Sequence, residues 1–91
     1  MPGEGQYYCY IVRCTDGTFY TGWTTDPVRR CKQHNQGTGA KYTRIHRPVE
    51  LVYTEILSCR SDAMKREVKI KNMKRSQKEK LINSRVQNET G

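Results

Sequence analysis

With 91 residues, the chain is long enough for one domain with a thin hydrophobic core. Hydrophobic residues make up 34% of it, which excludes a wholly disordered protein, while 17 Lys and Arg against 9 Asp and Glu leave a net charge of +8. A charge excess of this size favours a polyanionic partner, of which nucleic acid is the commonest. The alternative is an ordinary solvated surface, although such surfaces usually mix both signs.

The expected compartment follows from what the chain lacks. It has no apolar run long enough to cross a membrane and no apolar leader segment. Its 4 cysteines show no paired spacing typical of zinc sites, so we expect free thiols packed as small hydrophobic side chains in a reducing compartment. We therefore expect a cytoplasmic protein without a membrane partner, and we expect it to be a monomer.

Two strands joined by a tight turn are predicted near the start of the chain. Residues 7–14 and 18–24 are rich in aromatic and β-branched side chains, and an Asp-Gly turn signal lies between them. A two-residue loop would place Tyr10 and Tyr20 on opposite faces of the ribbon. A three-residue loop with Gly17 in the left-handed conformation would place them on one face as diagonal neighbours. If the two tyrosines act together, the three-residue loop is required.

Helices are predicted on either side of a third strand. An Asp-Pro pair at residues 26–27 begins a helix that extends to about residue 35, where a glycine-rich segment ends it. Residues 36–48 are expected to form a polar, basic loop, followed by the third strand at residues 49–57. Ser61 is expected to cap a second helix that extends to about residue 75, and residues 76–79 form a capping box for a short third helix.

The expected fold class is therefore a small α+β sandwich, with the elements in the order strand, strand, helix, strand, helix, helix. Residues 7–83 form its single domain, between flexible segments at residues 1–6 and 84–91. The sequence shows no internal repeat and no second domain.

Phosphodiester hydrolysis needs groups that move a proton, hold a phosphate and hold a metal ion. Tyr10 and Tyr20 supply phenols, and Arg30 supplies a guanidinium. Arg30 and His34 are four residues apart, which places them on one face of the predicted helix. Each of these side chains also has an ordinary interpretation, as strand aromatics, a surface cation and a partly exposed histidine.

Glu67 is the most informative carboxylate of the chain. On a helical wheel it falls near the middle of an apolar arc formed by Ala63, Met64, Val68, Ile70 and Met73. An ionised carboxylate in such a position is costly unless a metal ion or another cation compensates its charge. The alternative is an ordinary helical pair with Lys71, four residues further along the chain.

The order and spacing of these residues resemble the GIY-YIG nuclease family. The likeness covers about residues 7–82, with Tyr8-Cys9-Tyr10 and Tyr20-Thr21-Gly22 in the places of the two tripeptides that give the family its name. In size, the chain is similar to the small single-domain bacterial members. The resemblance implies a three-stranded antiparallel sheet flanked by helices, in the order β-β-α-β-α-α, and an endonuclease activity.

The resemblance also implies catalytic roles for Tyr10, Tyr20, Arg30, His34 and Glu67. Glu67 matches the sole protein ligand of the divalent metal, and one carboxylate with waters and substrate phosphate suits Mg²⁺ or Mn²⁺. Arg30 matches an arginine that stabilises charge on the scissile phosphate. Tyr20 matches a leading candidate for the general base and would need nearby positive charge to act near neutral pH. His34 is the alternative base.

The chain departs from the family pattern at several positions. Tyr8 and Cys9 replace the first glycine and the isoleucine. Trp23 stands where some members carry a lysine that contacts the active-site water or phenol, and Lys41 is a candidate to reach in from the loop instead. Asn72 is the candidate for an asparagine that several family enzymes carry late in the domain. These departures bear on turnover more than on the fold.

A nucleic-acid interface is expected on residues 27–49, which contain no acidic residue. Basic side chains in such a segment suit contacts to phosphates, which are independent of base sequence. The expected nucleic-acid-binding residues are Arg29, Lys32, Lys41, Tyr42, Arg44 and Arg47.

Two functions fit these features. The first is a metal-dependent endonuclease that hydrolyses DNA, with branched or damaged DNA of repair or recombination among its candidate substrates and a partner protein to supply targeting. The second is a nucleic-acid-binding module of the same fold with little turnover. Glu67 favours the enzyme, because a carboxylate without a metal would repel phosphate. The sequence does not distinguish DNA from RNA.

Overall fold

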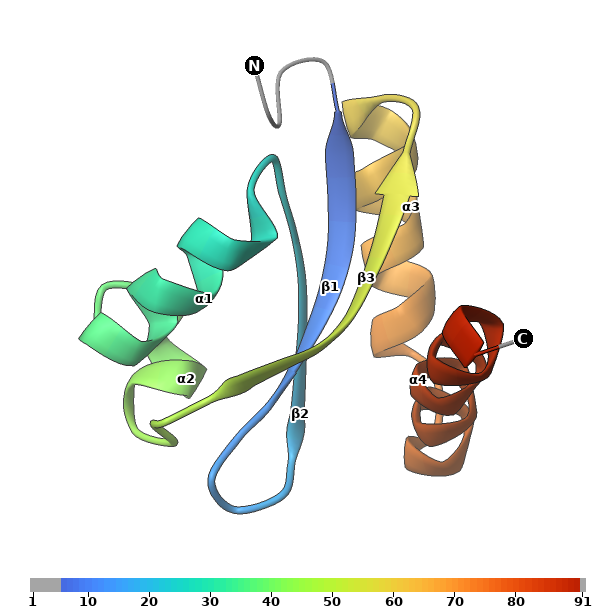
Figure 1. Cartoon of the computed structure of the whole chain (residues 1–91). Helices are drawn as coiled ribbons and strands as arrows, with labels where there is room; N and C mark the ends of the chain where they lie inside the picture. The colour runs from blue at the N-terminus through green and yellow to red at the C-terminus, as the bar shows by residue number, and fades with distance from the viewer. Residues whose placement is uncertain (1–5, 91) are drawn as a thin grey trace.

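The computed structural model describes residues 6–90, with side-chain environments for residues 6–84. Within this part of the chain the elements follow the order β-β-α-α-β-α-α (Figure 1). Their bounds are β1 Tyr7–Arg13, β2 Phe19–Thr24, α1 Pro27–Gln36, α2 Lys41–Arg44, β3 Glu50–Leu57, α3 Arg60–Lys71 and α4 Arg75–Thr90. The predicted α+β class with a three-stranded antiparallel sheet is confirmed. None of the described helices is long and apolar enough to cross a membrane.

The loop between the first two strands has the predicted length. The backbone amide of Cys14 donates to the carbonyl of Thr18 at 2.8 Å, which leaves residues 15–17 as the loop. Gly17 has a φ of 87°, in the left-handed region that a glycine adopts without strain. The three-residue loop is therefore confirmed.

This loop fixes the register of the hairpin. Tyr10 lies opposite Gly22, and Tyr20 lies opposite Val12. Because alternate residues of a strand share a face, Tyr10 and Tyr20 are diagonal neighbours on the same face of the sheet. The two tyrosines therefore share the face that joint action requires.

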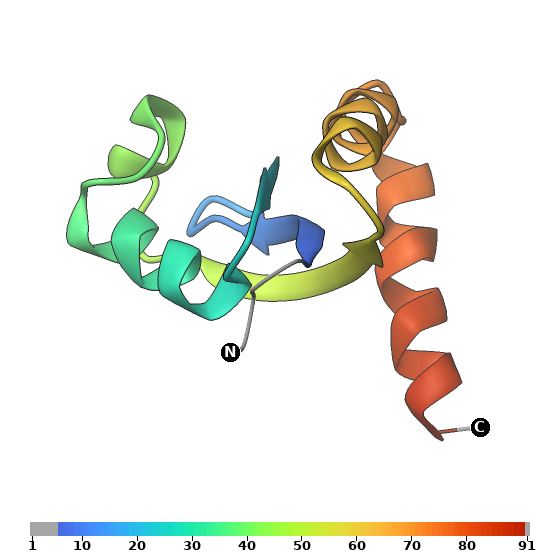
Figure 2. The same ribbon diagram turned by 90° about the horizontal axis from the view of Figure 1, so that it is seen from above.

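The sheet has the strand order β2-β1-β3, so β1 is central and β2 and β3 are edge strands. Figure 2 shows α1 and α2 on one side of the sheet and α3 and α4 on the other. Side chains alternate between these two layers along β1. The buried cluster on the α1 side contains Tyr10, Val12, Cys14 and Val49, and the cluster on the α3 side contains Cys9, Ile11, Tyr53 and Ile70.

The first helix begins and ends as its sequence predicts. The side chain of Asp26 accepts a hydrogen bond from the amide of Arg29 at 3.2 Å, and Pro27 occupies the first turn. Gly37 ends the helix in the left-handed conformation, with a φ of 85°. These two signals set where α1 begins and ends.

Three features of the later elements differ from the predictions. The loop expected at residues 36–48 contains the short helix α2, because tertiary contacts of Thr43 hold this turn. The second helix begins after Cys59, without a side-chain cap from Ser61, and already ends at Lys71.

The third helix begins one residue before the predicted capping box. The side chain of Gln77 accepts a hydrogen bond from the amide of Lys74 at 2.8 Å. Gln77, and not Glu79 of the predicted box, therefore caps the start of this helix. This helix extends to Thr90. The flexibility expected at residues 1–6 and 84–91 stays a prediction, and residues 1–5 and 91 lie outside the described part.

Candidate active site

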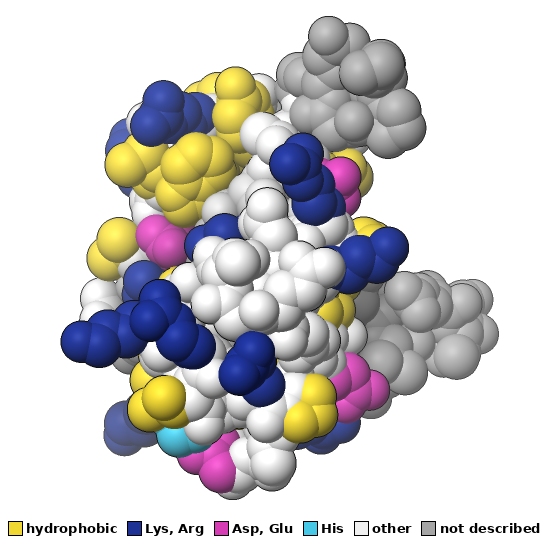
Figure 3. Space-filling view, turned by 90° about the vertical axis from the view of Figure 1, so that its left-hand side faces the viewer, with side chains coloured by type: hydrophobic (Ala, Val, Ile, Leu, Met, Phe, Trp, Pro, Cys, Tyr) yellow, Lys and Arg dark blue, Asp and Glu magenta, His cyan; other side chains and the backbone are white. Residues whose placement is uncertain are grey.

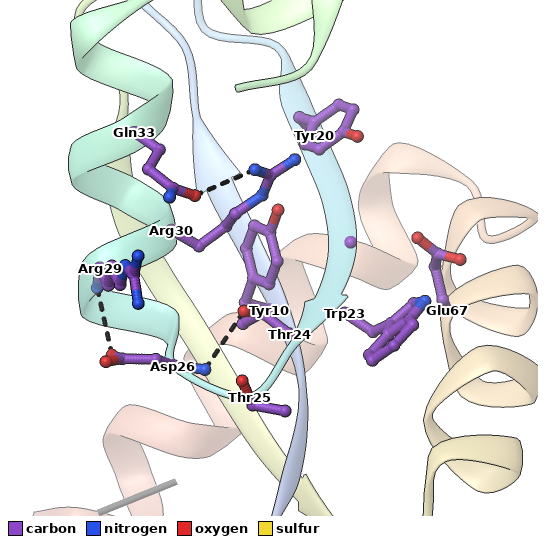
Figure 4. A pocket seen from close by; sticks show the side chains of 11 residues that line it. Tyr10, Tyr20, Trp23, Thr24, Thr25, Asp26, Arg29, Arg30, Gln33 and Glu67 are labelled. Atoms are coloured by element: carbon purple, nitrogen blue, oxygen red, sulfur yellow. Dashed lines mark hydrogen bonds between the residues drawn. The ribbon is translucent and has the colours of Figure 1, made fainter. Parts of the chain in front are cut away.

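A cavity of about 570 Å³ opens at the free edge of β2, between α1 and α3 (Figure 4). Four of the five predicted catalytic residues line it: Tyr10 and Tyr20 from the sheet, Arg30 from α1 and Glu67 from α3. The fifth, His34, lies behind Tyr10 and is fully buried. Sequence reasoning did not identify the polar side chains of Thr24, Thr25 and Gln33 as part of this cavity.

The position of Tyr10 depends on the glycine opposite it. The Tyr10 side chain is 1% exposed. A β-carbon on Gly22 would lie 2.6 Å from the Tyr10 hydroxyl oxygen and 2.8 Å from Cζ, which is too close for a real contact. The Tyr10 ring therefore packs directly on the backbone of β2, and the glycine of the second tripeptide is what allows this.

A buried chain of hydrogen bonds begins at the Tyr10 hydroxyl. Its oxygen lies 2.8 Å from Nε2 of His34, and Nδ1 of His34 lies 2.6 Å from Oγ1 of Thr43. Thr43 donates its own hydroxyl proton to the carbonyl of Ala40 at 2.9 Å. With the ring proton on Nδ1, Thr43 Oγ1 accepts from it and Nε2 accepts the phenolic proton of Tyr10. With the ring proton on Nε2, Nδ1 accepts from the amide of Ala40 at 3.4 Å and the Tyr10 oxygen accepts from Nε2.

Burial sets the protonation states of this pair. Burial raises the pKa of Tyr10 to about 12, although the nearby Arg30 acts in the opposite direction. Burial, assisted by the positive charge of Arg30, lowers the pKa of His34 to about 4. At neutral pH the pair is therefore a neutral phenol beside a neutral imidazole.

The protein is expected to lose stability as the pH falls from about 6.5 toward 4. His34 stays neutral in the folded protein down to a pKa of about 4, whereas the unfolded chain takes up the proton near the ordinary value of 6.5. Its contribution is fully present above pH 6.5 and decreases as the pH falls, by up to about 3 kcal/mol. Thermal unfolding followed by circular dichroism between pH 7 and pH 4.5 measures this slope.

Two substitutions separate His34 from the other acid-sensitive groups. His34→Gln removes the titrating ring and is expected to flatten the slope between pH 6.5 and 4.5. His46→Gln removes the second histidine, which lies 3.2 Å from Asp16, so any part of the slope that comes from this ion pair is lost in His46→Gln and kept in His34→Gln. A slope in His34→Gln equal to that of the unmodified protein would show that His34 is not the source.

Arg30 projects from α1 into the cavity beside the two tyrosines (Figure 4). Its Nη1 atom donates to Oε1 of Gln33 at 3.0 Å, which holds the guanidinium in place. Arg29, which is exposed, lines the same cavity. The two guanidiniums give the cavity a positive wall suited to a phosphate group.

Glu67 reaches the cavity from the opposite side of β2, on α3 (Figure 4). Its side chain is 20% exposed, and its Oε2 atom lies 3.5 Å from Nζ of Lys71. Both sequence interpretations are therefore present in the geometry, since the carboxylate faces the cavity and also pairs with the lysine one turn along. The pair supplies part of the compensation that a half-buried carboxylate requires.

Tyr20 lies at one end of the cavity and is partly exposed. Its ring contacts the edge of His34, with centroids 5.4 Å apart, and stacks on Tyr42 at 6.2 Å and 17°. Among the described residues, none forms a hydrogen bond with its hydroxyl group. Tyr20 therefore differs from Tyr10, which has a proton acceptor at 2.8 Å.

Comparison with known proteins agrees with this geometry. A family model described as the GIY-YIG catalytic domain matches residues 6–80. The chain belongs to the GIY-YIG family. It therefore shares the nuclease-type fold of a family that generally depends on metal ions.

Relatives of similar length occur in distant organisms. The chain is 52% identical to a UPF0213 protein of Staphylococcus saprophyticus over 77 residues, which are 85% of this chain and 94% of the relative. It is also 52% identical to a UPF0213 protein of Halobacterium salinarum over 76 residues, which are 84% of this chain and 99% of the relative. The names of these two relatives state no activity.

Two solution NMR structures resemble this one. A protein of E. faecalis has 44% identity and a TM-score of 0.62, with 92% of this chain and 90% of that chain covered. The UPF0213 protein of Bacillus halodurans has 45% identity and a TM-score of 0.55, with 86% of this chain and 83% of that chain covered. The fold of these structures agrees with the GIY-YIG assignment.

The residues that depart from the family pattern occupy distinct places. Trp23 lines the cavity, and the guanidinium of Arg60 lies 5.5 Å from its ring. Lys41 and Asn72 do not line the cavity, so neither is in place to supply the group that Trp23 replaces or the late family asparagine. The cavity still offers the cations of Arg29 and Arg30.

Two carboxylates line this cavity, Glu67 from α3 and Asp26, which already accepts from the amide of Arg29 as the cap of α1. The described residues contain no group of three or more His, Cys, Asp or Glu side chains that could hold a metal by themselves. Mg²⁺ is commonly bound by one or two carboxylates together with waters and substrate phosphates. Glu67, half-buried beside a phosphate-sized cavity, fits that mode of binding.

The predicted nucleic-acid contacts lie on the α1 and α2 side of the molecule. Figure 3 looks onto this side, across which Lys and Arg side chains are spread. Lys32, Lys41, Arg44 and Arg47 are all exposed, and Arg47 also donates to the carbonyl of Asn35 at 3.4 Å. Tyr42 extends the aromatic surface of Tyr20 away from the cavity.

Proposed function

We propose that this protein is a metal-dependent endonuclease that hydrolyses phosphodiester bonds of DNA. The observation that carries this proposal is the position of Tyr10, which lines the cavity and whose hydroxyl oxygen lies 2.8 Å from Nε2 of a buried histidine that is neutral near pH 7. Arg30 and Glu67 lie on the walls of the same cavity. Together they supply a proton acceptor, a phosphate-binding cation and a carboxylate in one place.

The proton of the attacking water goes to Tyr10. As the water oxygen bonds to phosphorus, its proton passes to the Tyr10 oxygen, and the phenolic proton of Tyr10 passes to Nε2 of His34. In this relay, which requires the ring proton of His34 on Nδ1, Tyr10 ends as a neutral phenol, His34 becomes an imidazolium, and the bond from phosphorus to the leaving oxygen breaks. The leaving oxygen takes up a proton from solvent, and the imidazolium then returns its proton to solvent through Tyr10. The route avoids a free phenolate, which a pKa of about 12 would make rare, and its imidazolium is short-lived because the pKa of His34 is about 4.

Arg30 binds the non-bridging oxygens of the scissile phosphate and stabilises the charge that develops on them. Glu67 would hold one Mg²⁺ or Mn²⁺ ion, with Lys71 displaced from its pairing distance. When bound, such an ion neutralises phosphate charge and supports the leaving oxygen. Tyr20 contacts the ring of His34 and helps to fix its orientation.

Cleavage of end-labelled nucleic acids tests the proposal. Linear duplex, single-stranded, flapped and four-way branched DNA, each with a matched RNA, are incubated with the protein in Mg²⁺, Mn²⁺ or EDTA. We expect cleavage of at least one DNA substrate that requires the metal. Cleavage of RNA alone would move the substrate class to RNA, and no cleavage of any substrate would contradict the proposal.

A nucleic-acid-binding module of the same fold is the second candidate. It is favoured by one specific observation, which is that Lys71 pairs with Glu67 at 3.5 Å and supplies a counter-charge from within the chain. A module of this kind would bind the same substrates without turnover. The two candidates differ in what Glu67 does, and substitution of this residue distinguishes them.

Binding to duplex DNA is expected to depend on salt through the α2 segment. The double variant Lys41→Gln with Arg44→Gln removes two exposed charges, and the slope of log K against log salt is expected to become shallower by about two. Fluorescence anisotropy of a labelled duplex between 50 and 300 mM NaCl measures the slope. An unchanged slope, with a shallower one in Lys65→Gln with Lys69→Gln, would place the DNA on the exposed side of α3.

A further inference from the structure

A second, smaller hollow, called the recess below, lies next to the proposed active site along the edge of β2. It has a volume of about 220 Å³ and is lined by Phe19, Tyr20, Thr21, Tyr42, Lys71 and Lys78. Tyr20 is a wall of both hollows, and α3 contributes Glu67 to the first and Lys71 to the second. A polymer strand along the edge of β2 would therefore pass directly from one hollow into the other.

The walls of this recess suit a flat ring. Tyr20 and Tyr42 present nearly parallel rings, with an interplanar angle of 17°, whereas Phe19 points to the α3 face, where Arg75 lies 4.6 Å from its ring. Tyr42 is held by two contacts, since its hydroxyl donates to Thr18 at 2.7 Å and its ring packs on His46 at 4.4 Å. The volume is below the roughly 300–1,000 Å³ typical of pockets for drug-sized ligands, so one ring system fits.

Thr21 lines the hollow but does not contribute its hydroxyl to the aromatic wall. It lies opposite Ile11, on the α3 face of the sheet, whereas Tyr20 lies opposite Val12 on the α1 face. Its Oγ1 atom is buried and forms no hydrogen bond with any described residue. The contacts that a ligand would make in this recess therefore come from the rings and the lysines.

Two cations stand at the recess. Lys71 lies 5.9 Å from the centroid of the Tyr20 ring, and Lys78 lines the same hollow from α4. Burial, together with the like charge of Lys71, lowers the pKa of Lys78. An anion between the two ammonium groups would reduce their mutual repulsion. The phosphate of a nucleotide whose base lies in the recess would supply this anion.

We propose that this recess binds one unpaired nucleotide adjacent to the scissile phosphate, with its base against the Tyr20 and Tyr42 rings and its phosphate near Lys71 and Lys78. A base inside the recess has left the stack of a duplex, so the preferred substrate is a single-stranded or locally unpaired nucleic acid. This inference rests on the proposed function for the position of the scissile phosphate, but the recess itself is independent of turnover.

The binding test uses a strand of eight thymidines with one central 2-aminopurine, in EDTA so that cleavage does not occur. Stacking on an aromatic ring quenches this base, so we expect a saturable loss of fluorescence on addition of the protein. The same strand paired to its complement is expected to bind without a comparable change. An equivalent RNA strand shows whether the recess distinguishes the two sugars.

Variants assign the signal to the recess. Tyr42→Leu is expected to weaken binding of the single strand by about 5- to 150-fold, the range for one stacked base, whereas Tyr42→Phe keeps the ring and most of the affinity. Lys78→Gln is expected to make the salt slope shallower by about 0.7, and Lys80→Gln on the same helix is expected to leave it unchanged. Circular dichroism confirms that each variant is folded.

The outcomes separate this inference from the proposed function. Quenching that requires Tyr42, in a protein that cleaves nothing, would support the recess and contradict the endonuclease. Cleavage with unchanged fluorescence, or equal quenching and affinity in Tyr42→Leu, would overturn the recess and leave the endonuclease intact. If Tyr42→Leu does not fold, the Lys78→Gln and Lys80→Gln pair decides, and equal salt slopes for the two would overturn the proposal.

Discussion

Replacing Glu67 with glutamine is expected to reduce metal-supported cleavage to background while binding of nucleic acid in EDTA is kept or becomes tighter. Glutamine keeps the size of the side chain but removes the charge that a divalent ion requires. It also removes a negative charge from a cavity lined by two arginines, which favours a phosphate in the absence of metal. Single-turnover cleavage in Mg²⁺ and anisotropy in EDTA measure the two effects separately.

Glu79→Gln is the matched control for this substitution. Glu79 pairs with Arg75 at 3.3 Å with the same four-residue helical spacing, but it lies outside the proposed active site. If Glu67 served only as the partner of Lys71, both variants would lose a few tenths of a kcal/mol of stability and both would cleave at the original rate. Cleavage retained in Glu67→Gln, by a preparation free of other nucleases, would favour the binding module.

Local signals were sufficient to predict the elements that carry the catalytic residues. The turn signal before Thr18 and the left-handed Gly17 define the hairpin, and the hairpin register decides that Tyr10 and Tyr20 share a face. The Asp26 cap and the Gly37 end define α1 in the same way. These signals are short-range, because each depends on the conformation of a few neighbouring residues.

The parts that the sequence did not predict depend on contacts between distant segments. The short helix α2 lies in a polar, glycine-containing stretch with no periodic pattern, and it is held by the bond from His34 to Thr43. His34 was expected to be a catalytic residue and alternative base, or else a partly exposed histidine, and the structure places it fully buried between the sheet and this helix. No spacing rule in the sequence links residue 43 to residue 34, so the proton acceptor behind Tyr10 becomes visible only in the fold.

The free edge of β2 explains how one cavity gathers groups from both faces of the sheet. Tyr10 and Glu67 belong to opposite layers, since one packs under α1 and the other is carried by α3. At the edge strand the two layers meet, and Gly22 lets the Tyr10 ring lie against the backbone of β2 at this point. The second tripeptide, Tyr20-Thr21-Gly22, therefore supplies both a phenol and the glycine that allows Tyr10 to pack against the edge strand.

A comparison of Tyr10→Phe with Tyr20→Phe is expected to identify the proton acceptor. Both substitutions remove one hydroxyl oxygen and keep the ring, so their packing effects are small. If Tyr10 passes a proton to His34, Tyr10→Phe is expected to slow cleavage by about 100- to 10,000-fold, the range for loss of general-base catalysis. Tyr20→Phe is expected to have a much smaller effect, because its hydroxyl has no acceptor among the described residues.

Stability provides an independent readout of the same pair. Tyr10→Phe leaves Nε2 of the buried His34 without its donor, which is expected to cost about 1–3 kcal/mol, whereas Tyr20→Phe leaves no buried group unpaired. Urea unfolding at pH 7 measures both costs, and single-turnover rates are compared at a temperature where each variant is folded. A large rate loss in Tyr20→Phe together with a small one in Tyr10→Phe would move the general base to Tyr20 and leave the bond between Tyr10 and His34 with a structural role.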